Sequence, residues 1–131
     1  MTTDMMLESF TRNYFVHLLG FEIESLDEEA VTLKLSIREE LLNTIGTLHG
    51  GVHASMLDTL LGMTIRSATT MPCTTINLNI SYLNTATSDE LFATGKILRQ
   101  GYKNATAEGE IHDSNGVLLT KAIGTFKLIR K

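Results

Sequence analysis

The chain has 131 residues, 43% of them hydrophobic and 20% charged, with a formal net charge of -4 at pH 7. This size indicates one domain with enough apolar material for a core, and the negative charge argues against nucleic acid or an anionic membrane surface as the main partner. A single cysteine, Cys73, excludes an internal disulfide bond and any cysteine-based metal cluster. Because the chain shows no signal-peptide pattern and no apolar run long enough to cross a bilayer, we expect a cytoplasmic protein with one domain over residues 1–131.

The first third of the chain predicts a helix followed by two strands. Apolar or aromatic side chains recur at every fourth position from Met6 to Leu18, which predicts one helix over Thr3–Leu19 that stops at Gly20. Apolar and polar residues then alternate in FEIESL (residues 21–26) and AVTLKLSI (residues 30–37), as in strands. The polar residues 38–47 that follow are expected to form a loop.

A second helix is predicted from Gly50 to about Thr69. Its residues are apolar on nearly all sides, and a helix of this kind is buried on all sides. In a chain this short, such burial requires a sheet that wraps around the helix.

Four further strands follow Pro72, in INLNISYL, ELFATGKILRQ, KNATAEGEIHD and VLLTKAIGTFKLI, and Asn115-Gly116 marks a hairpin turn between the last two. Short turns between consecutive strands favour an antiparallel meander. The predicted fold class is therefore α+β, with a six-stranded antiparallel sheet wrapped around one central helix. Six strands cannot close around a helix, so the open sheet edges should pair two copies of the chain edge to edge.

Two glycines open the second predicted helix, in the stretch NTIGTLHGGVHASMLDTLLGMTIRS. Gly50 and Gly51 allow the backbone to approach a ligand closely, and the first N–H groups of a helix lack intrahelical partners. These groups suit an oxyanion or a polarised carbonyl oxygen. The alternative is that the glycines only permit a tight turn from loop to helix.

Asp58 is a lone acid about two turns into this apolar helix. A carboxylate in such surroundings costs free energy unless it is paired, hydrogen-bonded or exposed in a cleft. A cleft at a subunit interface would let Asp58 act as a nucleophile or as a general base toward water. The alternative is a solvent-facing strip of the helix, for which the neighbouring leucines leave little room.

The i, i+4 pair His49 and His53 has a spacing that occurs in zinc sites. Gly50 stands where the metalloprotease motif has Glu, and no third ligand is evident nearby, so we predict no metal. The role of His53 is left open. A small basic cluster at the C-terminal end, formed by Lys127, Arg130 and Lys131, leaves room for a phosphorylated ligand.

The pattern N-x-x-G-x-x-H-G-G-x-x-x-x-x-x-D resembles the signature of the PaaI-like hotdog-fold acyl-CoA thioesterases. The similarity covers almost the whole chain, including LGFEI, INLNISYLNTA and GKILRQGYKNATAEGEI. The residues that carry the pattern are Asn43, Gly46, His49, Gly50, Gly51 and Asp58.

This resemblance implies an antiparallel sheet around a long helix, chains paired through their third strands, and dimers that associate into homotetramers. It places active sites at the dimer interface with residues from both chains. Asp58 would be the catalytic carboxylate, and the Gly50 N–H would polarise the thioester carbonyl. Asn43 would stand near that carbonyl or orient water, His49 would hold the loop and contact the thioester region, and Thr75 would help to place water.

Substrate contacts are expected at Gly51 and, for the anionic nucleotide of coenzyme A, at Arg99, Lys103 and Asn104 around the turn between the fourth and fifth strands. The last three residues would otherwise be ordinary solvated turn residues. The predicted function is hydrolysis of acyl-CoA to acid and CoA, without a metal or cofactor. The alternatives are a non-catalytic acyl-CoA-binding protein and a hydroxyacyl-thioester dehydratase that uses His49 with Asp58. The acyl group is left open among aryl, phenylacetyl-type, hydroxybenzoyl and medium-chain fatty acyl groups.

Overall fold

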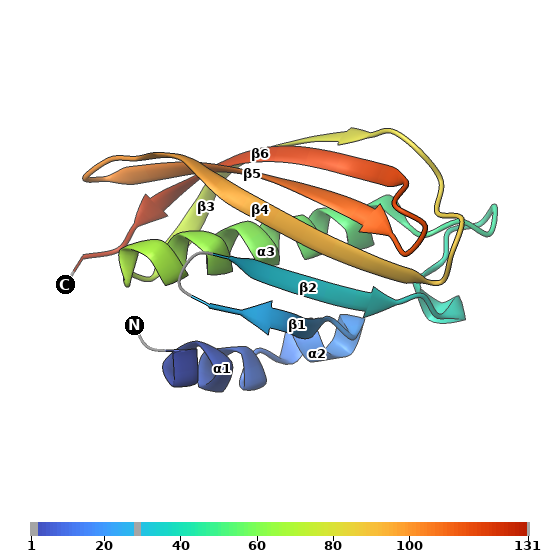
Figure 1. Cartoon of the computed structure of the whole chain (residues 1–131), viewed down its shortest axis with the longest axis horizontal. Coiled ribbons are helices and arrows are strands. Elements are labelled where there is room, and N and C mark those ends of the chain that lie inside the picture. Colours follow the sequence, from blue (N-terminus) through green and yellow to red (C-terminus); the bar gives the residue numbers. More distant parts are fainter. Residues whose placement is uncertain (1–2, 28–29, 131) are drawn as a thin grey trace.

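A computed structural model of the chain describes residues 3–27 and 30–130 (Figure 1). None of the helices in these ranges combines the length and apolar character needed to cross a bilayer. The elements in chain order are α1 (Thr3–Thr11), α2 (Tyr14–Leu19), β1 (Glu22–Leu26), β2 (Val31–Ser36), the 3₁₀ turn η1 (Glu39–Leu41), α3 (Gly50–Thr69), β3 (Cys73–Tyr82), β4 (Glu90–Gln100), β5 (Asn104–Asp113) and β6 (Leu118–Leu128).

The prediction of one N-terminal helix over Thr3–Leu19 is wrong, because the chain breaks between α1 and α2. Asn13 leaves the helical conformation and its side-chain oxygen accepts a hydrogen bond from the Val16 N–H, which makes it the N-cap of α2. The break rotates the second helix, so Val16 is fully buried while Tyr14 is 85% exposed. The predicted stop at Gly20 is confirmed, since this residue ends α2 with a φ of 87°.

The six strands form one antiparallel sheet in the order β1-β2-β4-β5-β6-β3. The predicted meander is therefore confirmed for β4, β5 and β6, but wrong for β3, which pairs with β6. Periodicity along the chain predicts each strand but does not predict which strands pair with it. The segment between β3 and β4 is long enough for the chain to cross the sheet, so that β4 pairs with β2. Strands β1 and β3 are left as the open edges of the sheet.

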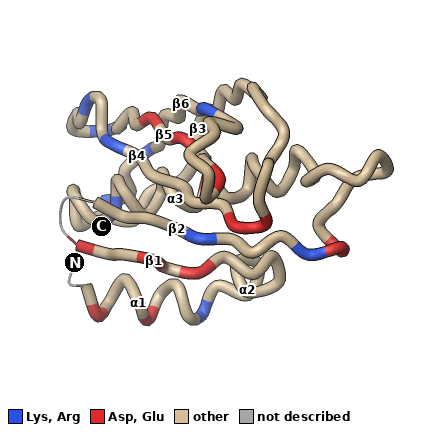
Figure 2. Tube along the Cα trace, turned by 45° about the vertical axis from the view of Figure 1, so that its right-hand side comes forward, with Lys and Arg blue, Asp and Glu red and all other residues tan. Residues whose placement is uncertain are grey.

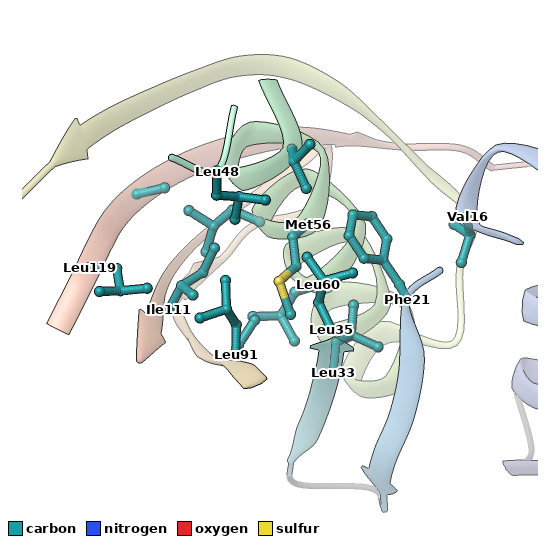
Figure 3. Packing of buried hydrophobic residues seen from close by; sticks show 14 of the residues in the cluster. Val16, Phe21, Leu33, Leu35, Leu48, Met56, Leu60, Leu91, Ile111 and Leu119 are labelled. Carbon is teal, nitrogen blue, oxygen red and sulfur yellow. The ribbon is translucent and has the colours of Figure 1, made fainter. Parts of the chain in front are cut away.

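Helix α3 lies in the concave face of this sheet, with β3 to β6 passing over one side of it and β1 and β2 along another (Figure 1). Met56, Leu57 and Leu60 are fully buried and pack against apolar side chains of the sheet. Figure 3 shows Met56 and Leu60 between side chains of β2, β4, β5 and β6. The α+β arrangement of a six-stranded sheet around a central helix is thus confirmed.

The helix packs directly on the backbone of the central strands, where three glycines face Leu61. A Cβ atom built on Gly95, Gly109 or Gly124 would lie 3.2, 3.1 or 3.2 Å from a Leu61 methyl group. Gly95 and Gly109 are cross-strand partners, so the gap extends from one strand to the next. A side chain at these positions would force Leu61 or the adjoining strand to shift, so the glycines permit the close approach of α3 to the sheet.

Asp113 organises the predicted Asn115-Gly116 turn and ties it to the segment before β4. Its Oδ1 atom accepts hydrogen bonds from the N–H groups of Asn115 and Val117, both at 3.0 Å. Its Oδ2 atom accepts from the Thr87 hydroxyl at 2.6 Å and the Thr87 N–H at 2.8 Å. The Thr87 hydroxyl is the largest cause that lowers the pKa of Asp113 to about 2, and the backbone donors add to the shift against the effect of burial.

A pKa below the ordinary value of a carboxyl group means that ionised Asp113 stabilises the fold. This contribution is complete above about pH 4 and is lost as the pH falls through about 2. We expect Asp113→Asn to lower stability at neutral pH and to flatten its decline in acid, as measured by urea unfolding across this range. Glu39→Gln, a change to an exposed side chain that makes no hydrogen bond or ion pair within the described residues, is the control. An unaltered pH profile for Asp113→Asn would contradict this role.

Candidate active site

Asp58 lies on α3 where the helix faces β3, and the two elements are joined there by a hydrogen bond between side chains. The Thr75 hydroxyl donates to the Asp58 Oδ1 atom at 2.6 Å. The half-buried Asp58 side chain borders a cavity of about 300 Å³ between α1, α3 and β3. Asp58 thus borders a cavity beside Thr75, on a half-buried strip of α3 that also carries Ser55 and Arg66, and its role as the catalytic acid stays a prediction.

The start of α3 is capped by the side chain of the residue that precedes it. The His49 Nδ1 atom accepts a hydrogen bond from the Gly51 N–H at 2.8 Å. A Cβ atom on Gly51 would lie 3.0 Å from this nitrogen, so the second glycine leaves room for the imidazole cap. The Gly51 amide is thereby occupied, whereas the predicted ligand contact would need it free.

The Gly50 N–H, in contrast, makes no hydrogen bond within the described part of the chain. It borders a separate cavity of about 230 Å³, which Asn43, His53 and Tyr82 also line. The Tyr82 hydroxyl donates to the Gly50 carbonyl oxygen at 3.0 Å and so holds the adjoining peptide group. No sequence pattern marks Tyr82 for this contact. Among the first N–H groups of α3, the Gly50 N–H is thus available to an external acceptor.

Asn43 shapes the loop that leads to the helix. Its side-chain oxygen accepts from the N–H groups of Ile45 and Thr47 at 3.1 Å each, and its amide nitrogen donates to the Thr47 hydroxyl at 2.8 Å. Gly46 completes the turn with a φ of 85°. The side chain therefore positions the loop beside Gly50, with one amide hydrogen left for a ligand.

His53 is buried next to the same cavity, and its Nδ1 atom lies 2.6 Å from the Thr120 hydroxyl oxygen. The ring also makes an edge-to-face contact with Tyr82, with centroids 5.7 Å apart. Burial lowers the pKa of His53, which favours the neutral ring. His49 and His53 thus have different partners: the first caps the helix, and the second supports the Tyr82 side of the cavity.

Gly50 and Asp58 do not meet within one chain. They are separated by eight residues on α3 and by about 12 Å along its axis. Strand β3 runs antiparallel to the helix, so its start bonds to Asp58 through Thr75 and its end bonds to Gly50 through Tyr82. The carboxylate and the free amide therefore occupy opposite ends of one helix–strand pair.

The predicted contacts for the nucleotide lie at a third place, the turn between β4 and β5. Lys103 and Asn104 line a cavity of about 420 Å³ together with Lys127 and Arg130. The Arg130 guanidinium lies 3.8 Å from the centre of the Tyr102 ring and donates to the Tyr102 carbonyl oxygen. Figure 2 shows basic residues gathered at this turn. Arg99 is exposed nearby and does not line the cavity, and Lys131 lies outside the described residues.

Comparisons with known proteins agree on one family. The family model described as "Thioesterase superfamily" matches residues 45–120, which is more than half of the chain. A protein of Saccharolobus solfataricus with a provisional esterase name is 30% identical over 115 residues, with 86% of this chain and 81% of that protein covered. The medium/long-chain acyl-CoA thioesterase YigI of Escherichia coli is 29% identical over 129 residues, with 86% and 83% covered.

Among solved structures, the PaaI protein of E. coli, from the phenylacetic acid degradation operon, has the same fold with a TM-score of 0.88. It is 21% identical in sequence, and the match covers 95% of this chain and 90% of that one. The hotdog fold and the resemblance predicted from the sequence are both confirmed. The chain is a member of the thioesterase superfamily.

Proposed function

We propose that this thioester hydrolase acts on acyl-CoA, at active sites shared between two copies of the chain. The observation that carries the proposal is the separation of Asp58, bonded to Thr75, from the free Gly50 N–H at the opposite end of the same helix and strand. The similarity to YigI, which is named for medium- and long-chain acyl-CoA, supports the substrate class.

A two-fold pairing of β3 with the β3 of a second copy would bring the two parts of the site together. Strand β3 is an open edge of the sheet, and in an antiparallel pair the start of one strand lies opposite the end of the other. A two-fold axis near Leu78 and Asn79 would place Thr75 opposite Tyr82 of the partner subunit. The Asp58 that Thr75 binds would then face the Gly50 amide of the second copy, next to the Gly50 carbonyl that the partner's Tyr82 bonds, giving two equal sites in each homodimer.

In this site the Gly50 N–H donates to the thioester carbonyl oxygen and stabilises the negative charge that develops there. Asp58 either attacks the carbonyl carbon or removes a proton from a water molecule that attacks it. The carbon–sulfur bond breaks, CoA leaves as a thiolate that takes up a proton, and the acid is released. Thr75 holds one carboxylate oxygen of Asp58 and leaves the other to react.

The residues around the Gly50 amide act by holding it in place. His49 caps the helix start through Gly51, and Asn43 fixes the loop beside it. The His49 Nδ1 atom is engaged by the Gly51 N–H, and the match to the thioesterase superfamily supports the hydrolase over the dehydratase. The basic cavity of Lys103 and Lys127 is suited to the phosphate groups of CoA, with Asn104 and Arg130 at its border and Arg99 nearby.

The homotetramer stays a prediction from the family resemblance. Analytical ultracentrifugation would measure the number of chains in the assembly.

Replacing the carboxylate should abolish turnover without unfolding the protein. We expect Asp58→Ala and Asp58→Asn to lower kcat on acyl-CoA by on the order of 10²–10⁴-fold, because the general base or nucleophile is lost. Thr75→Val should lower kcat less, and Thr75→Ser should retain the hydroxyl and most of the rate. Release of free thiol from a panel of acyl-CoA thioesters measures these effects, with circular dichroism as the folding control. Full turnover by Asp58→Ala would overturn the assignment, and tight binding without hydrolysis by the unaltered protein would favour the non-catalytic alternative.

The Gly50 amide can be removed without disturbing the helix. Proline is tolerated at the first position of a helix and lacks the N–H, and the ψ of 135° at His49 suits a residue that precedes proline. We expect Gly50→Pro to lower kcat by on the order of 10²–10³-fold, whereas Gly50→Ala, which keeps the amide, should retain most activity.

Mixing the two inactive variants tests whether each site uses two chains. A heterodimer of Asp58→Ala and Gly50→Pro subunits has one site with an intact Asp58 and an intact Gly50, so unfolding and refolding the mixture should restore part of the activity. Each variant refolded alone should stay inactive. If the mixture gains nothing while size-exclusion chromatography shows dimers, the site is not shared in this way.

A further inference from the structure

Arg66 shares the cavity of Asp58, two turns farther along α3. Its Nη1 atom donates to the Ser9 hydroxyl of α1 at 3.1 Å. Its Nε atom is buried without a hydrogen-bond partner, and no carboxylate of the described residues lies within ion-pair distance of the guanidinium. The sequence pattern assigns no role to this residue.

The Arg66 side chain is half-buried, and its buried Nε atom lacks the hydrogen-bond partner that such donors normally have. A buried donor or charge without a partner costs free energy, and the partner of choice for Arg is a carboxylate bound through two parallel hydrogen bonds. Ser9 satisfies one donor and leaves the rest of the guanidinium for another acceptor. The missing acceptor can come from a ligand in the cavity.

Polar as well as apolar side chains line the cavity. Met63 and Phe126 contribute apolar surface, but Asn13, Thr74 and Arg66 also line it. Pockets for unsubstituted chains are lined mainly by hydrophobic and aromatic side chains, and a few placed polar groups fix the orientation of a functional group.

Asp58 and Arg66 stand at two ends of the space available to an acyl group. Eight residues of helix separate them by about 12 Å along the axis, and both charges act on the Cys73 thiol between α3 and β3. Burial is the main cause that raises the pKa of Cys73, while Arg66 lowers it and Asp58 raises it. Because Asp58 and Arg66 line the same cavity, a chain whose thioester lies at Asp58 has room to extend toward Arg66.

We propose that this cavity binds the acyl group and that Arg66 pairs with a carboxylate at its far end, so that the preferred substrates are CoA thioesters of dicarboxylic acids. This inference rests on the proposed function, because it takes the thioester to lie at Asp58. Arg66 is then a specificity determinant, whereas a purely structural Arg66 would only join α3 to α1 through Ser9.

The test compares substrates of equal length that differ in the terminal group, suberyl-CoA with octanoyl-CoA and adipyl-CoA with hexanoyl-CoA. The unaltered protein should have the higher kcat/KM on the carboxylated member of at least one pair. Arg66→Met should lower kcat/KM on that member by on the order of 10- to 100-fold and leave the unsubstituted member unchanged or improved. Arg66→Lys, which keeps the charge without the planar fork, should fall between the two. Ser9→Ala is the matched control: it removes the link to α1 and should keep the preference.

The outcomes separate this inference from the proposed function. The role of Arg66 would be overturned, with the proposed function left intact, by two results together. The protein would hydrolyse the unsubstituted substrates without preferring the carboxylated ones, and Arg66→Met would leave the ratio of kcat/KM between the two members of a pair unchanged. If no thioester is hydrolysed, calorimetric binding of suberyl-CoA and octanoyl-CoA to Asp58→Asn and to Asp58→Asn/Arg66→Met still decides it. Equal affinities in the two proteins would overturn the inference, and weaker binding of suberyl-CoA alone to the double variant would support it. Should Arg66→Met fail to fold, as thermal unfolding would reveal, Arg66→Gln takes its place.

Discussion

Helix α3 is apolar and buried on most of its surface, apart from one half-buried strip with Ser55, Asp58 and Arg66, and the arrangement of the rest of the chain follows from the need to cover it. Met56, Leu57 and Leu60 point to different parts of the sheet and are all fully buried. The sheet can surround the helix only by curving, and it can lie close enough only where glycines replace side chains opposite Leu61. Covering a single helix in this way still leaves two strands unpaired along one side, β1 and β3, so the demand that shapes the fold also leaves an edge for association.

The polar groups of the proposed site lie at the two ends of the contact between α3 and β3. The bond from Thr75 to Asp58 and the bond from Tyr82 to Gly50 fix β3 on α3 at both ends. They also hold the carboxylate and the backbone amide apart, with the packed length of the helix between them. A reaction that needs both groups on one carbonyl therefore calls for a second copy. Strand β3, whose outer side is open, carries Thr75 and Tyr82, which bond to the two residues to be joined.

The hydrophobic period was sufficient to predict the long helix, each strand and the wrapped sheet, because apolar residues on most sides of a helix give a plain signal, although α3 keeps one half-buried strip. It could not show that β3 pairs with β6, since alternation describes one strand at a time. The break at Asn13 also escaped it, because the every-fourth-residue spacing continues across the cap. For the site, the motif indicated Asp58 and Gly50, but the cap from His49 to Gly51 and the unpartnered Nε atom of Arg66 depend on side-chain positions that spacing does not encode.

The wall that α1 contributes to the Asp58 cavity differs in kind from the other walls. The α3 and β3 walls belong to the central packing and cannot shift without moving the acid, whereas α1 rests on the outside of the fold, where Met6 is buried but Met5 is 52% exposed. Changes in the first helix can therefore reshape the chamber while the reacting groups stay in place. In the proposed site, the reacting groups would thus lie in the part of the molecule that tolerates least change, and one wall of the acyl cavity in a helix whose sequence can vary at little structural cost.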